Sequence, residues 1–207
     1  MAKPSTSAPT SLRDAVLAVA QRRFLAHGYD GLAVRAIADE AGCTTMAVYT
    51  HFGGKDGLTQ TFFDEGFARL AAAQRAVPAD LPPRERVTAL CHAYRRLAHD
   101  FPHHYDLMLG AQSARFTPAP ESRARALATI TYLAEAVAPL QPSDAAPTSA
   151  EDHAHAIIAF CHGWVTLERA GLFRPGARQD RAFERGVVLL LGAAGRTTRS
   201  GTAARRN

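Results

Sequence analysis

Apolar residues recur along most of this chain at the three- and four-residue spacing of a helix that buries one face. Val, Ile, Thr and the aromatic residues form no alternating runs, and Ala is abundant, which favours helix over strand. Clusters of Gly, Pro and Ser separate the periodic segments. The pattern predicts an all-α protein with nine helices and no strand.

Four of the predicted helices lie in the first part of the chain, and turn residues separate them. Ser11 is expected to cap the first helix and Gly28 to stop it. Thr44 or Thr45 is expected to cap the third helix, which ends before the pair Gly53-Gly54. The expected extents of the four helices are about 12–27, 34–41, 45–52 and 55–76.

Five further helices follow a proline-rich break at Pro78, Pro82 and Pro83, which we interpret as the boundary between two functional regions. Their expected extents are about Arg84–Asp100, Pro102–Ala111, Glu121–Ala138, Ala150–Ala170 and Asp180–Ala194. The last two carry more apolar residues than one helical face needs, which predicts a buried dimer face. The apolar residues are Ile157, Ile158, Trp164, Val187, Val188, Leu189, Leu190 and Leu191.

The segment Val34–Lys55 has the organisation of a helix-turn-helix that reads DNA. Its first helix carries an inward apolar stripe, and Gly42 tolerates the positive φ that the turn requires. Its second helix is short, is anchored by Val48 and Phe52, and otherwise carries small or polar side chains that fit the major groove. These side chains are Thr44, Thr45, Met46, Ala47, Tyr49, Thr50 and His51.

Together with the residues on either side of it, this segment resembles the DNA-binding signature of the TetR family of repressors. The resemblance extends over about Leu12–Phe62. The resemblance rests on the spacing of Gly28-Tyr29, Arg35-x-Ile37-Ala38, Ala41-Gly42, Val48-Tyr49, His51-Phe52 and Lys55-x-x-Leu58. It implies a ligand-responsive transcriptional regulator, expected to be a repressor, that binds a palindromic operator in double-stranded DNA as a homodimer. A small-molecule effector is then expected to release the protein from the operator.

The resemblance also implies roles for single side chains. Those expected to approach base edges are Arg35, Thr45, Met46, Ala47 and Thr50. Those expected mainly to grip phosphates are Thr44, Tyr49, His51 and Lys55. Hydroxyls and an ammonium group at a helix N-terminus suit that second role. Ala33 stands where the family has Thr or Ser, which removes a cap worth about 1 kcal/mol; Asp30 or backbone contacts are expected to substitute.

The C-terminal half resembles the effector domain named for its Trp-His-Gly motif. The segments that carry this resemblance are Ala93-Tyr94 to Phe101-Pro102, Tyr105–Met108 and Phe160-Cys161-His162-Gly163-Trp164 to Gly171. Here Cys161 replaces the Trp of the motif. Apolar bodies with a few polar tips are expected to line an effector pocket between helices; a packed core is the alternative for each of them. They are Tyr94, Leu97, Phe101, Tyr105, Met108, Phe160, His162, Trp164 and Leu167.

Net charge does little to locate a DNA-binding surface. The chain carries a formal charge of +5, but Arg196, Arg199, Arg205 and Arg206 supply four of those charges after the last apolar stretch. Residues 1–57 hold six basic and five acidic side chains. We expect disordered tails at 1–10 and 196–207, a DNA-binding domain at 11–57, and an effector-binding and dimerisation domain at 58–195.

Cysteine usage and hydropathy indicate a cytoplasmic protein. The three cysteines are scattered, and no apolar run reaches the roughly 18–20 residues that span a bilayer. No signal peptide, cofactor, metal ion or catalytic residue is expected. A metal- or redox-responsive regulator stays open as an alternative, since the chain has His103-His104, His153-x-His155 and a turn thiol at Cys43. A helical enzyme using His162 and Glu168 is the other alternative.

Overall fold

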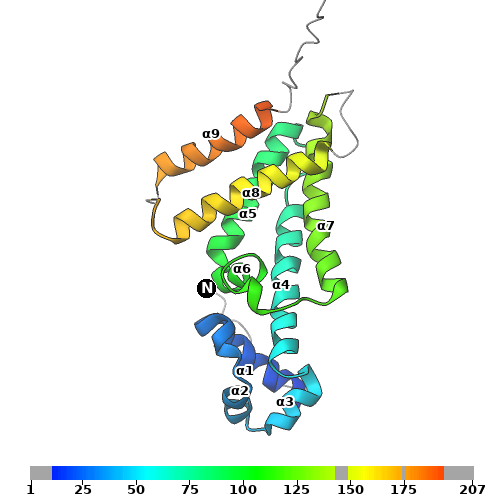
Figure 1. Ribbon diagram of the computed structural model, residues 1–207, viewed down its shortest axis with the longest axis vertical. Coiled ribbons are helices and arrows are strands. Elements are labelled where there is room, and N and C mark those ends of the chain that lie inside the picture. Colours follow the sequence, from blue (N-terminus) through cyan, green and yellow to red (C-terminus); the bar gives the residue numbers. More distant parts are fainter. Residues whose placement is uncertain (1–10, 143–148, 174–175, 194–207) are drawn as a thin grey trace, which may run out of the picture. The chain divides into compact units, whose positions relative to one another are not determined.

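The computed structural model in Figure 1 describes residues 11–142, 149–173 and 176–193. These residues form nine α-helices and three short 3-10 helices, with no strand among them, which confirms the predicted all-α fold. The expected tails, 1–10 and 196–207, lie outside the described residues. The α-helices are α1 Leu12–His27, α2 Val34–Ala41, α3 Thr45–Phe52, α4 Lys55–Arg75, α5 Pro83–Asp100, α6 Pro102–Met108, α7 Pro120–Val137, α8 Ser149–Arg169 and α9 Ala177–Ala193.

The predicted helix caps in the first part of the chain are confirmed. The hydroxyl of Ser11 accepts the N–H of Asp14 at 3.1 Å, which satisfies one donor at the start of α1. Thr44 does the same for Ala47 at 3.2 Å at the start of α3. Gly28 ends α1 at a φ of 60°, a value that residues with a Cβ rarely adopt. A 3-10 helix, η1 (Gly28–Leu32), then connects α1 to α2.

Helix α6 ends earlier than its apolar pattern predicts. It stops at Met108, whereas the predicted helix continues to Ala111. Leu109 leaves helical geometry at a φ of −142°, and the N–H groups of Leu109 and Gly110 both bond to the carbonyl of Tyr105. The shared acceptor closes the helix, and a 3-10 helix, η2 (Ser113–Arg115), follows.

Helix α9 begins earlier than predicted, at Ala177 rather than Asp180. The N–H groups of Gln179 and Asp180 both bond to the carbonyl of Gly176, at 2.8 and 3.2 Å. This closes a helical turn within a segment whose glycine and basic residues predict a loop. The final predicted residue of this helix, Ala194, lies outside the described residues.

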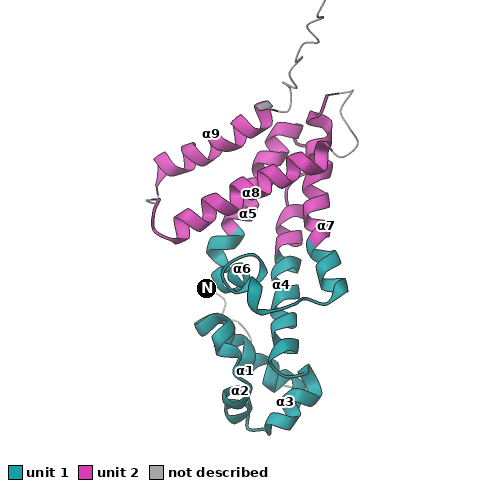
Figure 2. Cartoon of the chain, in the orientation of Figure 1, with its two compact units in different colours: residues 1–69, 97–126 teal, residues 70–96, 127–207 magenta. Residues whose placement is uncertain are grey.

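The chain divides into two compact units, which Figure 2 colours separately. Unit 1 comprises residues 1–69 and 97–126, and unit 2 comprises residues 70–96 and 127–207. Helices α4, α5 and α7 each contribute residues to both units. The boundaries between these units therefore differ from the expected boundary between a DNA-binding domain at 11–57 and an effector-binding domain at 58–195. That expected division stays a prediction.

The core of unit 1 is built around two stacked phenylalanines. The rings of Phe24 (α1) and Phe62 (α4) lie 4.4 Å apart and 11° from parallel. His104 (α6) meets the ring of Phe24 edge-on at 4.9 Å, in one of the geometries that aromatic pairs prefer. Ile37 (α2) and Val48 (α3) are fully buried. Helices α1, α2 and α3 thus share one core with α4 and α6.

Glu65 on α4 is the charged partner of that core. Its carboxylate is 2.5 Å from the Arg69 guanidinium and 3.5 Å from Nε2 of His104, which is 2% exposed. The contact with His104 and then that with Arg69 lower the pKa of Glu65 to about 2, against desolvation, which raises it. The ionised carboxylate therefore stabilises the folded state.

We expect Glu65→Gln to lower the free energy of unfolding at pH 7 by about 1–2 kcal/mol, discounted for partial exposure. Because the folded pKa is depressed, the stabilisation is complete above the unfolded pKa near 4.5 and is lost as the pH falls through about 2. Urea denaturation of both proteins between pH 7 and pH 2 measures this difference. A difference that stays constant over that range would contradict the assignment.

The core of unit 2 is formed by the facing sides of α5, α7, α8 and α9. Leu90 (α5), Leu133 (α7), Ile157 (α8) and Phe183 (α9) are all buried. The side-chain amide of Gln74, at the end of α4, donates to the carbonyl of Thr129 on α7 at 2.9 Å. That bond satisfies a buried amide and holds two helices together.

Candidate nucleic-acid interface and effector region

Helix α3 has one anchored face and one open face. Val48 is fully buried and Phe52 nearly so, and together they hold α3 against unit 1. Met46 is 70% exposed and Tyr49 55% exposed, so most of the surface of these two large side chains faces solvent. Thr44, Thr45, Thr50 and His51 are exposed as well, and Ala47 is half-buried. A mixed exposed face of this kind offers methyl, thioether, hydroxyl and imidazole groups to a DNA groove.

Helix α2 supports α3 through a tight turn. Ile37 and Ala38 are buried, and Gly42 ends the helix in the left-handed region at a φ of 66°. The N–H of Cys43 bonds back to the carbonyl of Ala38 at 2.9 Å, which closes the turn. Arg35, in the first turn of α2, is exposed.

The first turn of α2 lacks a side-chain cap, as Ala33 predicts. The backbone closes the turn, since the carbonyl of Ala33 accepts the N–H of Ile37 at 3.0 Å. Asp30, one of the two expected substitutes, instead pairs with Arg115 of η2 at 3.2 Å. Arg115 is a residue that the sequence did not single out, because it lies in a segment without helical periodicity.

Lys55, at the start of α4, lies against an aromatic ring. Its Nζ is 3.7 Å from the centroid of Tyr29, and the Arg115 guanidinium is 4.3 Å from the same ring. Partial burial lowers the pKa of Lys55, and the nearby charge of Asp30 acts against this. The cation–π contact positions the ammonium group at the boundary between α3 and α4.

Gly54 allows Tyr49 to lie over the same turn. A Cβ on Gly54 would overlap the ring of Tyr49, and Gly54 has a φ of 81°. The ring therefore packs on the turn while the side chain keeps 55% of its surface exposed. This is the arrangement in which a phenol hydroxyl reaches outward from a packed ring.

The residues predicted to line an effector pocket fall into both units. Unit 1 holds Leu97, Phe101, Tyr105 and Met108. Of these, Leu97, Tyr105 and Met108 are buried, and Phe101 lies beneath the Arg69 guanidinium at 4.3 Å. Unit 2 holds Tyr94, Phe160, His162, Trp164 and Leu167.

Within unit 2, two hollows adjoin the predicted pocket residues. Tyr94 lines an internal cavity of about 10 Å³ with Cys91 and Cys161. That volume holds about one water molecule and no effector. Trp164 lines a larger groove of about 570 Å³, whose other walls the sequence did not single out. Phe160 packs on Trp164 and Phe183, each at 5.6 Å.

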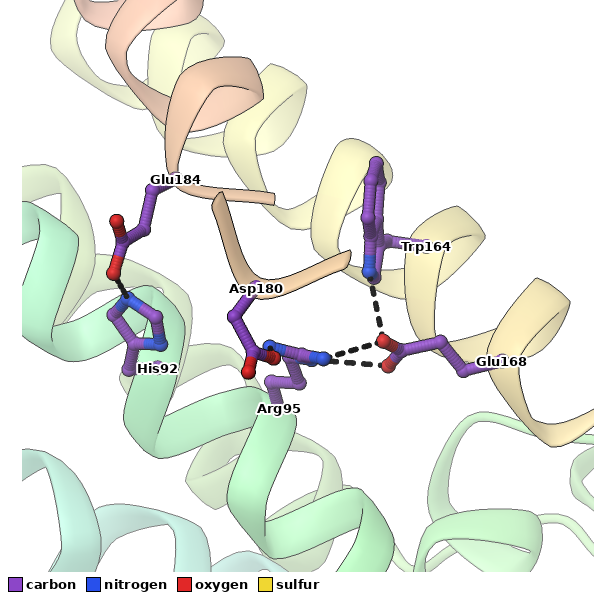
Figure 3. Close-up of polar contacts among 6 residues, drawn as sticks. All are labelled: His92, Arg95, Trp164, Glu168, Asp180 and Glu184. Carbon is purple, nitrogen blue, oxygen red and sulfur yellow. Dashed lines mark hydrogen bonds and ion pairs between the residues drawn. The ribbon is translucent and has the colours of Figure 1, made fainter. Parts of the chain in front are cut away.

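A polar network crosses the core of unit 2, as Figure 3 shows. Arg95 (α5) donates two hydrogen bonds to Glu168 (α8), at 2.5 and 3.0 Å, and pairs with Asp180 (α9) at 2.9 Å. The indole N–H of Trp164 donates to Glu168 at 3.0 Å. The side chains of Arg95 and Glu168 are only 15% and 8% exposed. This network holds α5, α8 and α9 together through charge-assisted hydrogen bonds.

His92 forms a separate polar contact between α5 and α9. Its Nε2 lies 3.5 Å from the carboxylate of Glu184 on α9, and its ring meets Phe183 edge-on at 5.3 Å. Burial lowers the pKa of His92, and Glu184 acts against this. The neutral imidazole of His92 contributes a packing contact with the edge of an aromatic ring. The positive charge among these residues is therefore that of Arg95.

Comparison with known proteins identifies the chain. A family model described as "Bacterial regulatory proteins, tetR family" matches residues 16–70. A second, described as "Tetracyclin repressor-like, C-terminal domain", matches residues 87–190. The chain belongs to the TetR family. The first TetR-family match covers most of α1, all of α2 and α3 and most of α4, and the second runs from α5 into α9.

Relatives of this TetR-family protein include two repressors. The transcriptional repressor AcnR of Corynebacterium glutamicum is 38% identical over 63 residues, which are 30% of this chain and 34% of AcnR. The transcriptional repressor KstR2 of Mycolicibacterium smegmatis is 33% identical over 94 residues, 44% of each chain. The chain therefore spans less than half the length of these curated relatives.

A solved structure has the same fold as this TetR-family protein. A protein with unknown function from Rhodococcus sp. RHA1 is 26% identical and superposes with a TM-score of 0.72. The superposition covers 94% of this chain and 100% of the other.

The geometry bears on the alternatives to a ligand-responsive TetR-family regulator. In the part of the chain that the structure describes, no three His, Cys, Asp or Glu side chains converge as metal ligands. His153 bonds to Gln141 and to the carbonyl of Leu190, which gives it a structural role. Glu168, the acid or base of the enzyme alternative, is bound by Arg95 and Trp164. The TetR family is one of regulatory proteins rather than of enzymes.

Two further findings concern hydropathy and the thiols. None of the described helices is long and apolar enough to cross a membrane. Cys43 is half-buried in the turn before α3, and Cys91 and Cys161 are buried. A hydrogen bond with Cys161 and burial raise the pKa of the Cys91 thiol. Since thiolates are the reactive form, this shift disfavours reaction at the Cys91 thiol.

Proposed function

We propose that this TetR-family protein is a transcriptional repressor that binds a palindromic operator as a homodimer and is released by a small-molecule effector. The observation that carries the proposal is the open face of α3. Val48 and Phe52 anchor that helix, while Met46 and Tyr49 expose apolar and aromatic surface that no neighbour covers. Residues 11–57 then form the DNA-binding region and residues 58–195 the effector-binding and dimerisation region.

Within the DNA-binding region, the proposed base contacts come from the exposed face of α3 and the start of α2. Arg35, Thr45, Met46, Ala47 and Thr50 approach base edges, where the Met and Ala side chains suit thymine methyl groups. Thr44, Tyr49, His51 and Lys55 hold phosphates. The capping hydroxyl of Thr44 and the N-terminal turn of α3 support a phosphate role, since helix N-termini attract anions.

Exposed apolar residues on the last helix support a homodimer. Val188 and Leu189 on α9 are 57% and 66% exposed, and Leu167 on α8 is 38% exposed. Adjacent exposed aliphatic residues of this kind mark surfaces that another chain covers. A two-fold dimer places two recognition helices about 34–36 Å apart, which matches the half-sites of a palindromic operator.

Effector binding between α5 and α8 would act on the operator through α4. That helix runs as one element from Lys55, beside the DNA-binding turn, to Arg75 in unit 2. A shift of α4 changes the separation of the two recognition helices, so that both half-sites cannot be held.

We also propose that the C-terminal region belongs to the Trp-His-Gly subgroup, which Phe160-Cys161-His162-Gly163-Trp164 supports.

Two substitutions separate phosphate contact from base reading. Lys55→Ala is expected to weaken binding about equally on operator and random DNA and to reduce the salt slope by about one phosphate contact. Thr45→Ala is expected to alter base preference at one position, because its contact discriminates between bases. Band shifts at several salt concentrations, on an operator selected from random DNA, measure both. Equal losses on operator and random DNA for Thr45→Ala would contradict its role as a base reader.

A further inference from the structure

The groove of about 570 Å³ lies between the end of α8 and the start of α9, within unit 2. Its volume falls in the range of small-molecule sites. Trp164 and Phe173 form one wall, with ring centroids 4.8 Å apart at 55°. Leu172 extends that wall and is 70% exposed. The groove therefore offers apolar and aromatic surface that is open to solvent.

The groove is also lined by polar and basic side chains. Arg178 and Gln179, in the first turn of α9, both line it. No carboxylate among the described residues pairs with Arg178, which is exposed. A guanidinium group without an acidic partner beside an apolar wall is suited to bind a carboxylate in two parallel hydrogen bonds.

The nearby acidic side chains already have hydrogen-bonding partners. Asp180 pairs with Arg95 at 2.9 Å, and Glu168 accepts hydrogen bonds from Arg95 and Trp164, as Figure 3 shows. The single guanidinium of Arg95 pairs with both carboxylates, so its charge balances only one of them, and Arg178 is the cation among the described residues that lines the groove. An anionic ligand would therefore be attracted by Arg178 itself, which has no acidic partner among the described residues.

We infer that this groove binds a small monocarboxylate with an apolar body, whose carboxylate lies at Arg178 and whose body lies against Trp164 and Phe173. The inference rests on the proposed function in one respect, namely that such a ligand would be an effector, and it places that effector between α8 and α9 rather than between α5 and α8. Trp164 connects the groove to α5, because its indole N–H bonds to Glu168, which holds Arg95. A ligand that moves Trp164 would perturb the network that joins α5, α8 and α9.

The full-length protein carries its own reporter, since Trp164 is the single tryptophan of the chain. Octanoate and octanamide share an apolar chain and differ in charge, so they serve as matched probes. Octanoate is expected to change the emission of Trp164 saturably, and octanamide to bind about tenfold more weakly. No emission change with octanoate, or equal affinities for the two probes, would overturn the inference.

Variants of α9 locate the carboxylate. Arg178→Gln is expected to remove the tenfold preference for octanoate. Arg185→Gln, two helical turns further along an exposed part of α9 and outside the groove, is expected to keep it. Ala182→Phe, which fills the groove, is expected to weaken both probes. An octanoate preference that survives Arg178→Gln would place the site elsewhere and overturn the inference.

The role as effector site is tested apart from the site itself. If octanoate binds as described and also releases the operator in a band shift, the site and the effector role are both supported. Binding without release leaves the site standing and overturns the effector role. If the groove binds neither probe and Arg178→Gln weakens dimerisation, the groove is a contact between two copies of the chain. That result overturns the inference. Operator binding still tests the proposed function separately.

Discussion

Arg95→Ala is expected to lower the free energy of unfolding by about 3–5 kcal/mol. The guanidinium donates two hydrogen bonds to Glu168, a carboxylate only 8% exposed, and also pairs with Asp180. Its removal leaves a buried negative charge without the cation that balances it. The lost contact between Arg95 and the ring of Phe183, at 5.0 Å, adds to the cost.

Two further variants distinguish a buried ion pair from general damage to the core. Asp180→Asn removes the exposed partner, which is 54% exposed, and is expected to cost at most about 1 kcal/mol. The double variant Arg95→Met with Glu168→Leu removes both buried charges and is expected to regain much of the stability. Urea denaturation of the four proteins measures these differences. A loss from Arg95→Ala no greater than that from Asp180→Asn would refute the assignment.

Gly57→Ala is expected to cost about 2–3 kcal/mol and to weaken operator binding, although the exchange adds one methyl group to a helix. A Cβ on Gly57, in the first turn of α4, would overlap the backbone carbonyl oxygen of Phe52, the last residue of α3. Backbone cannot swing aside as the end of a side chain can, so α3 must shift relative to α4. The shift displaces the proposed DNA-reading face.

Gly163→Ala is the matched control for this exchange. Gly163 also lies inside a helix, α8, but a Cβ there meets nothing within 4 Å. Alanine in an open helical position is expected to stabilise by about 0.5–1 kcal/mol. Thermal unfolding and band shifts of both variants measure the contrast. Equal stability of the Gly57→Ala and Gly163→Ala proteins would show that α4 accommodates the methyl group without moving α3.

Most helix boundaries could be predicted because the signals that set them act over a few residues. Ser11 and Thr44 cap the helices that follow them directly, and Gly28 supplies a backbone conformation that other residues avoid. The C-terminal end of α6 and the start of α9 could not be placed, since two N–H groups share one carbonyl at each of them. Hydrogen bonds of that kind depend on backbone geometry rather than on residue type.

The exposed face of α3 could be predicted from the sequence, whereas the surroundings of the predicted pocket residues could not. The open face of α3 follows from two buried positions, Val48 and Phe52, four residues apart on one helix. A pocket depends on which side chains of distant helices meet. Tyr94 and Trp164 were both predicted to line one pocket, but they line separate hollows of about 10 and 570 Å³.

The sequence by itself determined the helices, their caps and the helix-turn-helix, because periodicity, capping and glycine conformation are properties of neighbouring residues. Only the tertiary structure decided that Arg95 meets Glu168, 73 residues away, and that Arg115 meets Asp30, 85 residues away. It also decided that Arg178 lines a groove beside Trp164. Contacts at such separations depend on how helices pack, and packing is set by the whole core rather than by any local pattern.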